Sequence, residues 1–139
     1  MQTVLRILER AGGYRPTLCL KIENPPYMAL VIEATPEPGP LNLPSISVAH
    51  YGEQNGDLMR DPEMCFELSK PPLCGLALSV YYYRNDYMGV EQYSRFRDES
   101  NSVFVPDLYE QHEMFAEQWD RNLRDQRFVE AFTDKSIRG

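Results

Sequence analysis

The chain has 139 residues, of which 42% are hydrophobic and 12% aromatic, and it carries a formal net charge of −7. That length fits a single domain, residues 1–139, and the apolar content is too high for a disordered chain. No apolar run reaches the about 18 residues that a transmembrane helix needs, and the charged N-terminal stretch does not resemble a signal peptide, so we expect a cytoplasmic protein.

A short helix and a first pair of strands are predicted at the start of the chain. Apolar residues at helical spacing over 3–11 predict an amphipathic helix, which Gly12-Gly13 ends. Residues 17–23 alternate between apolar and polar side chains, and residues 27–33 place Met28, Leu30 and Ile32 on one face, as strands with a buried face do. Pro25-Pro26 between them cannot donate to a sheet ladder, so we expect a turn and an antiparallel hairpin.

A second, central hairpin is predicted in the middle of the chain. Ser45–Tyr51 alternates strictly, and residues 64–68 can return as the partner strand. Asn55-Gly56 lies between them and is the strongest short hairpin signal, because both residues tolerate positive φ. Pro62 predicts a bend or bulge in the returning strand.

An aromatic strand and a long helix follow. Residues 76–84 favour a strand, with Leu78, Val80 and Tyr82 on one face, Tyr81 and Tyr83 on the other, and residues 87–96 pairing back. Asp107 is the predicted N-cap of a helix whose apolar stripe packs on the sheet. The chain is therefore predicted to be α+β: a mostly antiparallel sheet of about six strands, with a short N-terminal helix and one or two C-terminal helices packed on one face.

The negative charge is concentrated in one segment of the chain. Residues 33–67 hold seven carboxylates against the single guanidinium of Arg60, a net −6 of the chain's −7. Because an acidic surface gains nothing from counterion release, direct nucleic-acid binding is not expected, and a basic or nucleic-acid-binding protein partner fits better. An ordinary solubilising surface is the alternative. The predicted interaction residues lie in and beside the hairpin turn: Glu53, Asp57, Asp61 and Glu63.

The tyrosine-rich strands are a second candidate site. Six aromatic residues between positions 81 and 96 could form a platform on which a nucleotide-like ligand stacks. The candidate ligand-binding residues are Tyr81, Tyr83, Arg84 and Tyr87, with the guanidinium placed to bind a phosphate. The same rings could instead pair across strands and stabilise the sheet.

Signals for catalysis or metal binding are weak. His50 lies near Glu53 and Asp57 in the sequence, and a histidine–carboxylate pair can act as a general base, but no nucleophile motif accompanies it. The three cysteines, Cys19, Cys65 and Cys74, are widely spaced in apolar segments without a zinc-binding pattern. We therefore predict no catalytic residue, no metal and no cofactor, and we expect His50 to be structural.

Three sequence runs resemble a known family. SVAHY at 47–51, EQNGDLM at 53–59, and DPEM at 61–64 followed by Phe66 look like the core of a small uncharacterised domain of phage and conjugative-element proteins. YMALVIE at 27–33 is similar to the strand that leads into that core. The resemblance covers roughly residues 15–68 and brings no activity or catalytic residue with it. It implies a mobile-element context.

The sequence as a whole favours an interaction protein. We expect a non-enzymatic protein of a mobile genetic element, such as an anti-defence protein, that inhibits or modulates a host defence or nucleic-acid-processing protein through its acidic surface. A small-ligand binding module that uses the tyrosine-rich strands is the alternative, and a small enzyme that uses His50 is the third interpretation. The sequence does not indicate an oligomeric state.

Overall fold

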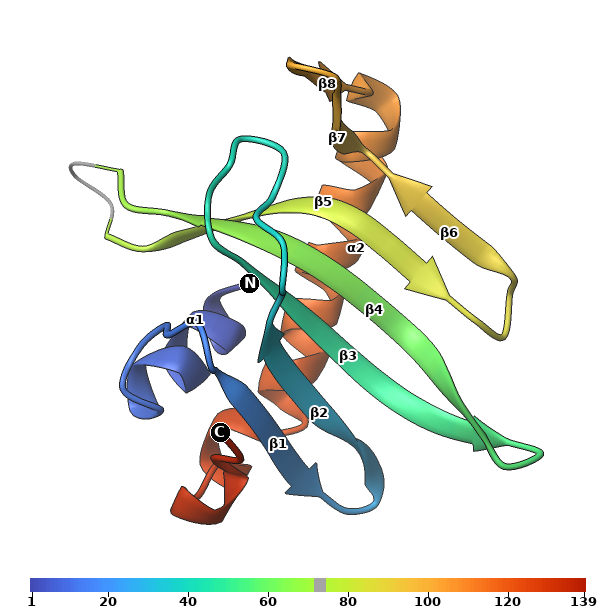
Figure 1. Cartoon of the computed structure of the whole chain (residues 1–139). Coiled ribbons are helices and arrows are strands. Elements are labelled where there is room, and N and C mark those ends of the chain that lie inside the picture. The colour runs from blue at the N-terminus through green and yellow to red at the C-terminus, as the bar shows by residue number, and fades with distance from the viewer. Residues whose placement is uncertain (72–74) are drawn as a thin grey trace.

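A six-stranded antiparallel sheet forms the centre of the computed structural model, which describes residues 1–71 and 75–139 (Figure 1). The strands lie side by side in their order along the chain, so the sheet is a meander. This confirms the predicted α+β fold. The bounds are β1 Cys19–Asn24, β2 Tyr27–Ala34, β3 Ser45–Gln54, β4 Asp57–Ser69, β5 Ala77–Asn85 and β6 Val90–Tyr93.

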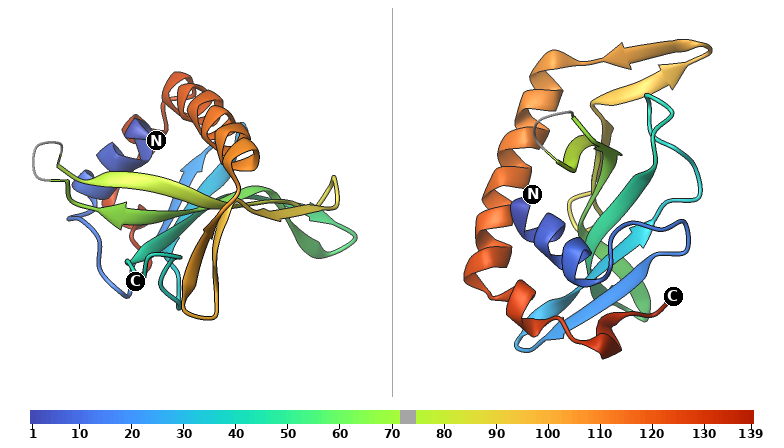
Figure 2. Two further views of the ribbon diagram at one scale, coloured as in Figure 1. Left: turned by 90° about the horizontal axis from the view of Figure 1, so that it is seen from above. Right: turned by 90° about the vertical axis from the view of Figure 1, so that its left-hand side faces the viewer.

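The two main helices, α1 (Gln2–Arg10) and α2 (Pro106–Asp125), cover one face of the sheet (Figure 2). A short helix, α3 (Phe128–Ala131), and a 3₁₀ turn, η1 (Asp134–Ser136), complete the chain. A separate hairpin of β7 (Arg95–Asp98) and β8 (Asn101–Phe104) leads into α2. Within the described residues, none of these helices is long and apolar enough to span a bilayer.

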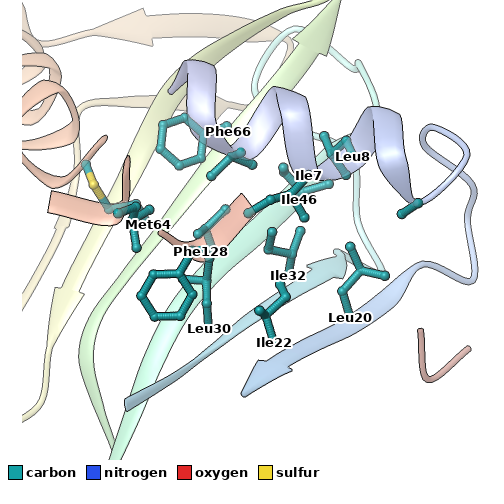
Figure 3. Packing of buried hydrophobic residues seen from close by; sticks show 14 of the residues in the cluster. Ile7, Leu8, Leu20, Ile22, Leu30, Ile32, Ile46, Met64, Phe66 and Phe128 are labelled. Carbon is teal, nitrogen blue, oxygen red and sulfur yellow. The ribbon is translucent and has the colours of Figure 1, made fainter. Parts of the chain in front are cut away.

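The core lies between this face of the sheet and the helices (Figure 3). Alternate side chains of the strands, such as Leu30 and Ile46, meet Ile7 of α1 and Phe128 of α3, and all four are fully buried. We call this the helix face. The opposite face, which carries Val31, Tyr51 and Tyr82, is the open face. Cys65 is buried and Cys19 half-buried, whereas Cys74 lies outside the described residues.

Two bulges decide which side chains reach which face. Asp61-Pro62 opposes His50 alone in the β3–β4 ladder, so the first bulge lies where Pro62 predicted it. The second lies opposite Cys65 and Phe66, which pair with Tyr82 and Val80 and leave Tyr81 as the extra residue. The prediction that Val80 and Tyr82 share a face was therefore wrong, because the bulge places Tyr82 on the open face.

Candidate interaction surfaces

Two of the predicted acidic residues lie at the tip of the β3–β4 hairpin. Asn55 and Gly56 form the turn with positive φ angles of 53° and 85°, as the sequence predicted. Glu53 and Asp57 flank this turn, and both are exposed. Within the described part of the chain, neither takes part in an ion pair. The hairpin tip, residues 53–57, therefore presents two free carboxylates.

The other two predicted acids are half-buried and engaged inside the protein. Asn85 Nδ2 donates a hydrogen bond of 2.9 Å to Asp61 Oδ1. Ser47 donates to Glu63, whose other oxygen lies 3.0 Å from Arg60 Nε. The four acids therefore do not form one exposed cluster, and the free negative charge of this region lies at the tip.

The four candidate ligand-binding residues of the tyrosine-rich strands lie in separate parts of the structure. Tyr83 lies on the helix face, where its ring centroid is 5.0 Å from that of Phe115. Tyr81 lies on the open face, with its hydroxyl 2.7 Å from Ser45 Oγ, and burial raises the pKa of Tyr81 to about 12. Arg84 is held by Asp86 at 2.6 Å, and Tyr87 is exposed in the next turn. These four residues do not converge on one ligand position.

A different small hollow adjoins Tyr81 on the open face. It encloses about 280 Å³ between Tyr81, Tyr93, Phe96, Arg97 and the loop at 38–40. The neighbouring guanidinium of Arg95 is already bound internally, with its Nη1 2.7 Å from Glu67 Oε1. Only Arg97 of these two arginines is exposed and can meet a ligand here.

His50 is packed in the helix-face core. Its ring lies between Trp119 and Phe128, with centroid distances of 5.5 and 5.6 Å, and its Nδ1 is 3.1 Å from the Ala29 carbonyl oxygen. Burial lowers the pKa of His50, which favours the neutral ring. In the described residues no hydrogen bond joins His50 to Glu53 or Asp57, so its surroundings are those of a core side chain.

The open face also carries hydroxyl and thiol groups. Cys65 is a possible nucleophile there, but burial raises the pKa of its thiol to about 12, which keeps it protonated at neutral pH. Ser47 is bound to Glu63, a carboxylate that Arg60 holds in an ion pair. Among the residues that the structure describes, no three histidine, cysteine, aspartate or glutamate side chains are grouped to hold a metal ion.

A larger hollow on the open face encloses about 710 Å³ and has an apolar centre. Ala29, Val31, Tyr51 and Leu58 line it, and Leu58 is 70% exposed. Neither α1 nor α2 covers this face, as Figure 2 shows. Cys19 and charged side chains of both signs complete the lining of what we call the open-face hollow: Lys21, Glu23, Glu33, Arg60 and Arg138.

The sequence held one signal of this hollow. Tyr27–Glu33 alternates, but the positions that point away from the core carry Ala29 and Val31 instead of polar residues. A strand with apolar residues on both faces is typical of a sheet whose second face also contacts something.

Comparison with known proteins places the chain in a family. A family model described as a domain of unknown function, DUF6908, matches residues 2–129. No curated protein and no solved structure is significantly similar to the chain. The match spans both main helices and the whole sheet, well beyond residues 15–68. The chain therefore belongs to the DUF6908 family.

Proposed function

We propose that this domain is a non-enzymatic protein-interaction module that binds its partner on the open-face hollow, with the acidic hairpin tip at the edge of the contact. The observation that carries the proposal is an uncovered sheet face whose apolar centre is surrounded by charges. The central hairpin resembles a domain of phage and conjugative-element proteins. We therefore place this protein in the cytoplasm of a cell that carries a mobile genetic element. The partner is then a host defence or nucleic-acid-processing protein.

The composition of the hollow supports protein binding. Protein interfaces combine an apolar centre with a polar rim and are enriched in tyrosine and arginine. Arg60 lies with its guanidinium carbon 6.0 Å from the Tyr51 ring centroid, within cation–π range. Leu58 is the most exposed apolar residue beside them. Burying Leu58 against a partner would release ordered water and favour association.

The hairpin tip adds a charge preference. Glu53 pairs directly with Leu58 across the hairpin, so both side chains point to the same face. Free carboxylates at the edge of an interface mainly raise the association rate of a basic partner, and salt screens this effect. The tip therefore favours a partner that carries lysine or arginine opposite Glu53.

Capture of partners from host lysate tests the proposal when two matched baits are compared. The variant Glu53→Gln/Asp57→Asn removes the two charges of the hairpin tip. The control Asp98→Asn/Glu99→Gln removes two exposed charges from the β7–β8 turn, so both baits have the same net charge. We expect the parent and the control to retain a protein that the tip variant loses at low salt.

Mass spectrometry then identifies the protein that depends on the tip. Equal capture by the tip variant and the control would contradict the role of the hairpin tip. A captured protein that binds the Leu58→Gln variant as well as the parent would contradict the role of the open-face hollow.

A second candidate is a small anionic aromatic ligand in the hollow beside Tyr81. The observation that favours it is that Tyr93, Phe96 and the exposed Arg97 line the same hollow. Aromatic rings can stack on a nucleotide base, and an arginine can bind its phosphate. Saturation-transfer NMR with a mixture of nucleotides tests it, with Arg97→Gln as the variant. Binding that this variant retains would contradict a site in this hollow.

A further inference from the structure

A groove on the helix face carries several acidic side chains. It encloses about 550 Å³ between α2, the first residues of α1, and strands β4 and β5. We propose that this acid-rimmed groove binds a basic amphipathic segment of a protein partner, with lysine or arginine on one side of the segment and an apolar anchor on the other. This site goes beyond the proposed function, because the open-face hollow lies on the opposite face of the sheet.

The floor of the groove is apolar. Phe66 and Val80 of the sheet lie at its base, with Leu78 half-buried beside them. From α2, the small side chain of Ala116 leaves room above this floor, and Met114 is 64% exposed at the edge. Methionine adapts its shape to irregular apolar surfaces, so an anchor side chain entering here would be buried against flexible apolar atoms.

The rim consists of carboxylates along one side of α2. Glu110, Glu113 and Glu117 are spaced by three and four residues, so they share a face of the helix, and all three are exposed. In the described part of the chain none of them has an ion-pair partner. Like charges at this spacing repel one another, and a bound cation would relieve that repulsion.

Stabilisation of α2 does not account for the whole rim. Acidic side chains favour a helix mainly through its first turn, and Asp107 already occupies that turn. Glu113 and Glu117 lie further along, where the effect has faded. Asp120, at the end of the row, has a structural role: its Oδ1 accepts a hydrogen bond of 2.8 Å from Thr3 N. That contact caps α1 from α2 and fixes the wall of the groove.

Charge and shape together define the occupant. Among the described residues, no lysine, arginine or histidine lines the groove. The rim would repel a phosphate-bearing ligand or an anionic membrane, whereas a basic segment would meet three exposed carboxylates. A bound segment with basic residues but no apolar side chain would make no contact with the apolar floor. An amphipathic segment laid along the groove uses both features, as helix-in-groove complexes do.

Titration with a designed peptide tests the proposal. The probe is a short acetylated and amidated peptide with lysine and leucine at amphipathic helical spacing, and its affinity for the full chain is measured by calorimetry. A scrambled peptide of the same composition and a glutamate–leucine analogue are the comparisons. We expect the amphipathic basic peptide to bind most tightly and to weaken as salt rises, and the acidic analogue not to bind.

Matched variants locate the binding. We expect Glu110→Gln/Glu113→Gln/Glu117→Gln to lower the affinity for the peptide roughly tenfold, because the variant loses three exposed charge contacts. The control Glu37→Gln/Asp98→Asn/Glu99→Gln removes the same charge from exposed sites elsewhere and should bind like the parent. Among apolar variants, Met114→Gln should weaken binding and Leu58→Gln should not.

Three results would overturn the proposal. The first is equal loss of affinity in both triple variants, which would mean general attraction to an acidic protein. The second is equal affinity for the amphipathic and the scrambled peptide, which would remove the role of the apolar floor. The third is a dimer in sedimentation that the rim triple variant dissociates, which would assign the groove to a second copy of the chain.

Discussion

Glu67 and Arg95 form an ion pair inside the protein, beneath the loop that joins β2 to β3. Glu67 is 1% exposed, and its Oε1 accepts a hydrogen bond of 2.7 Å from Arg95 Nη1. Its Oε2 accepts one of 2.8 Å from the backbone of Leu41. The other guanidinium nitrogens donate to the Ser79 and Val80 carbonyl oxygens. The pair therefore ties that loop and the start of β7 to the sheet.

Removing one partner of this pair should be costly. Glu67→Ala leaves a buried guanidinium without its carboxylate, and the expected loss is about 3–5 kcal/mol in the free energy of unfolding. Guanidinium chloride denaturation measures it. Glu23→Ala breaks the exposed Lys21–Glu23 pair and serves as the control, with an expected change below about 1 kcal/mol. Similar losses in both variants would contradict the structural role of Glu67.

Two buried histidines make stability depend on pH. Burial lowers the pKa of both His50 and His112 below the ordinary value of 6.5, so the unfolded chain takes up protons at a higher pH than the folded protein does. This contribution to stability is complete above about pH 6.5 and declines as the pH falls below that value. The chain has no other histidine.

We expect the urea midpoint of the parent to be lower at pH 5.5 than at pH 7.5, the two sides of the ordinary histidine pKa. His50→Phe keeps an aromatic ring between Trp119 and Phe128 and removes one titrating group, so its midpoint should change less with pH. The comparison is the difference between the two midpoints, not their absolute values. A variant that retains the full pH dependence of the parent would show that His50 makes no contribution.

At the scale of elements, the sequence predicted the strands well because burial on one face leaves a period of two. It could not predict the bulge at Tyr81, since three consecutive tyrosines fit either face equally well. The start of α2 was also misplaced. The helix begins at Pro106 with Val105 as N-cap, because proline suits the first helical position, and the side chain of Asp107 makes no cap.

The apolar stripe of α2 also differs from its sequence pattern. Trp119 is 5% exposed beside His50, whereas Phe115 is 39% exposed although it contacts Tyr83. We expect Trp119→Ala to cost about 3–5 kcal/mol and Phe115→Ala about 1–2 kcal/mol, since the second side chain buries less surface. Equilibrium unfolding in urea measures both. Equal losses would mean that α2 is rotated from the position described.

At the scale of the whole molecule, the sequence shows the order of charged residues along the chain but not which face of the folded protein each one occupies. Asp61 and Glu63 lie close to the hairpin tip in sequence, yet Asn85 and Arg60 hold them inside the protein. Conversely, α2 carries six carboxylates and two arginines. Basic residues elsewhere in the chain offset this negative charge when charges are summed along the sequence. Only folding separates two acidic regions onto opposite faces of the sheet.

Two exposed apolar residues, one on each face of the sheet, give the most direct test of the proposed function. Leu58 belongs to the open-face hollow and Met114 to the acid-rimmed groove, and both are more than half exposed, so glutamine at either position should leave the fold intact. The measurement is the calorimetric affinity of the captured partner for the parent, Leu58→Gln and Met114→Gln. We predict a loss of roughly tenfold for Leu58→Gln and parental affinity for Met114→Gln. Parental affinity of the Leu58→Gln variant would contradict binding at the open face.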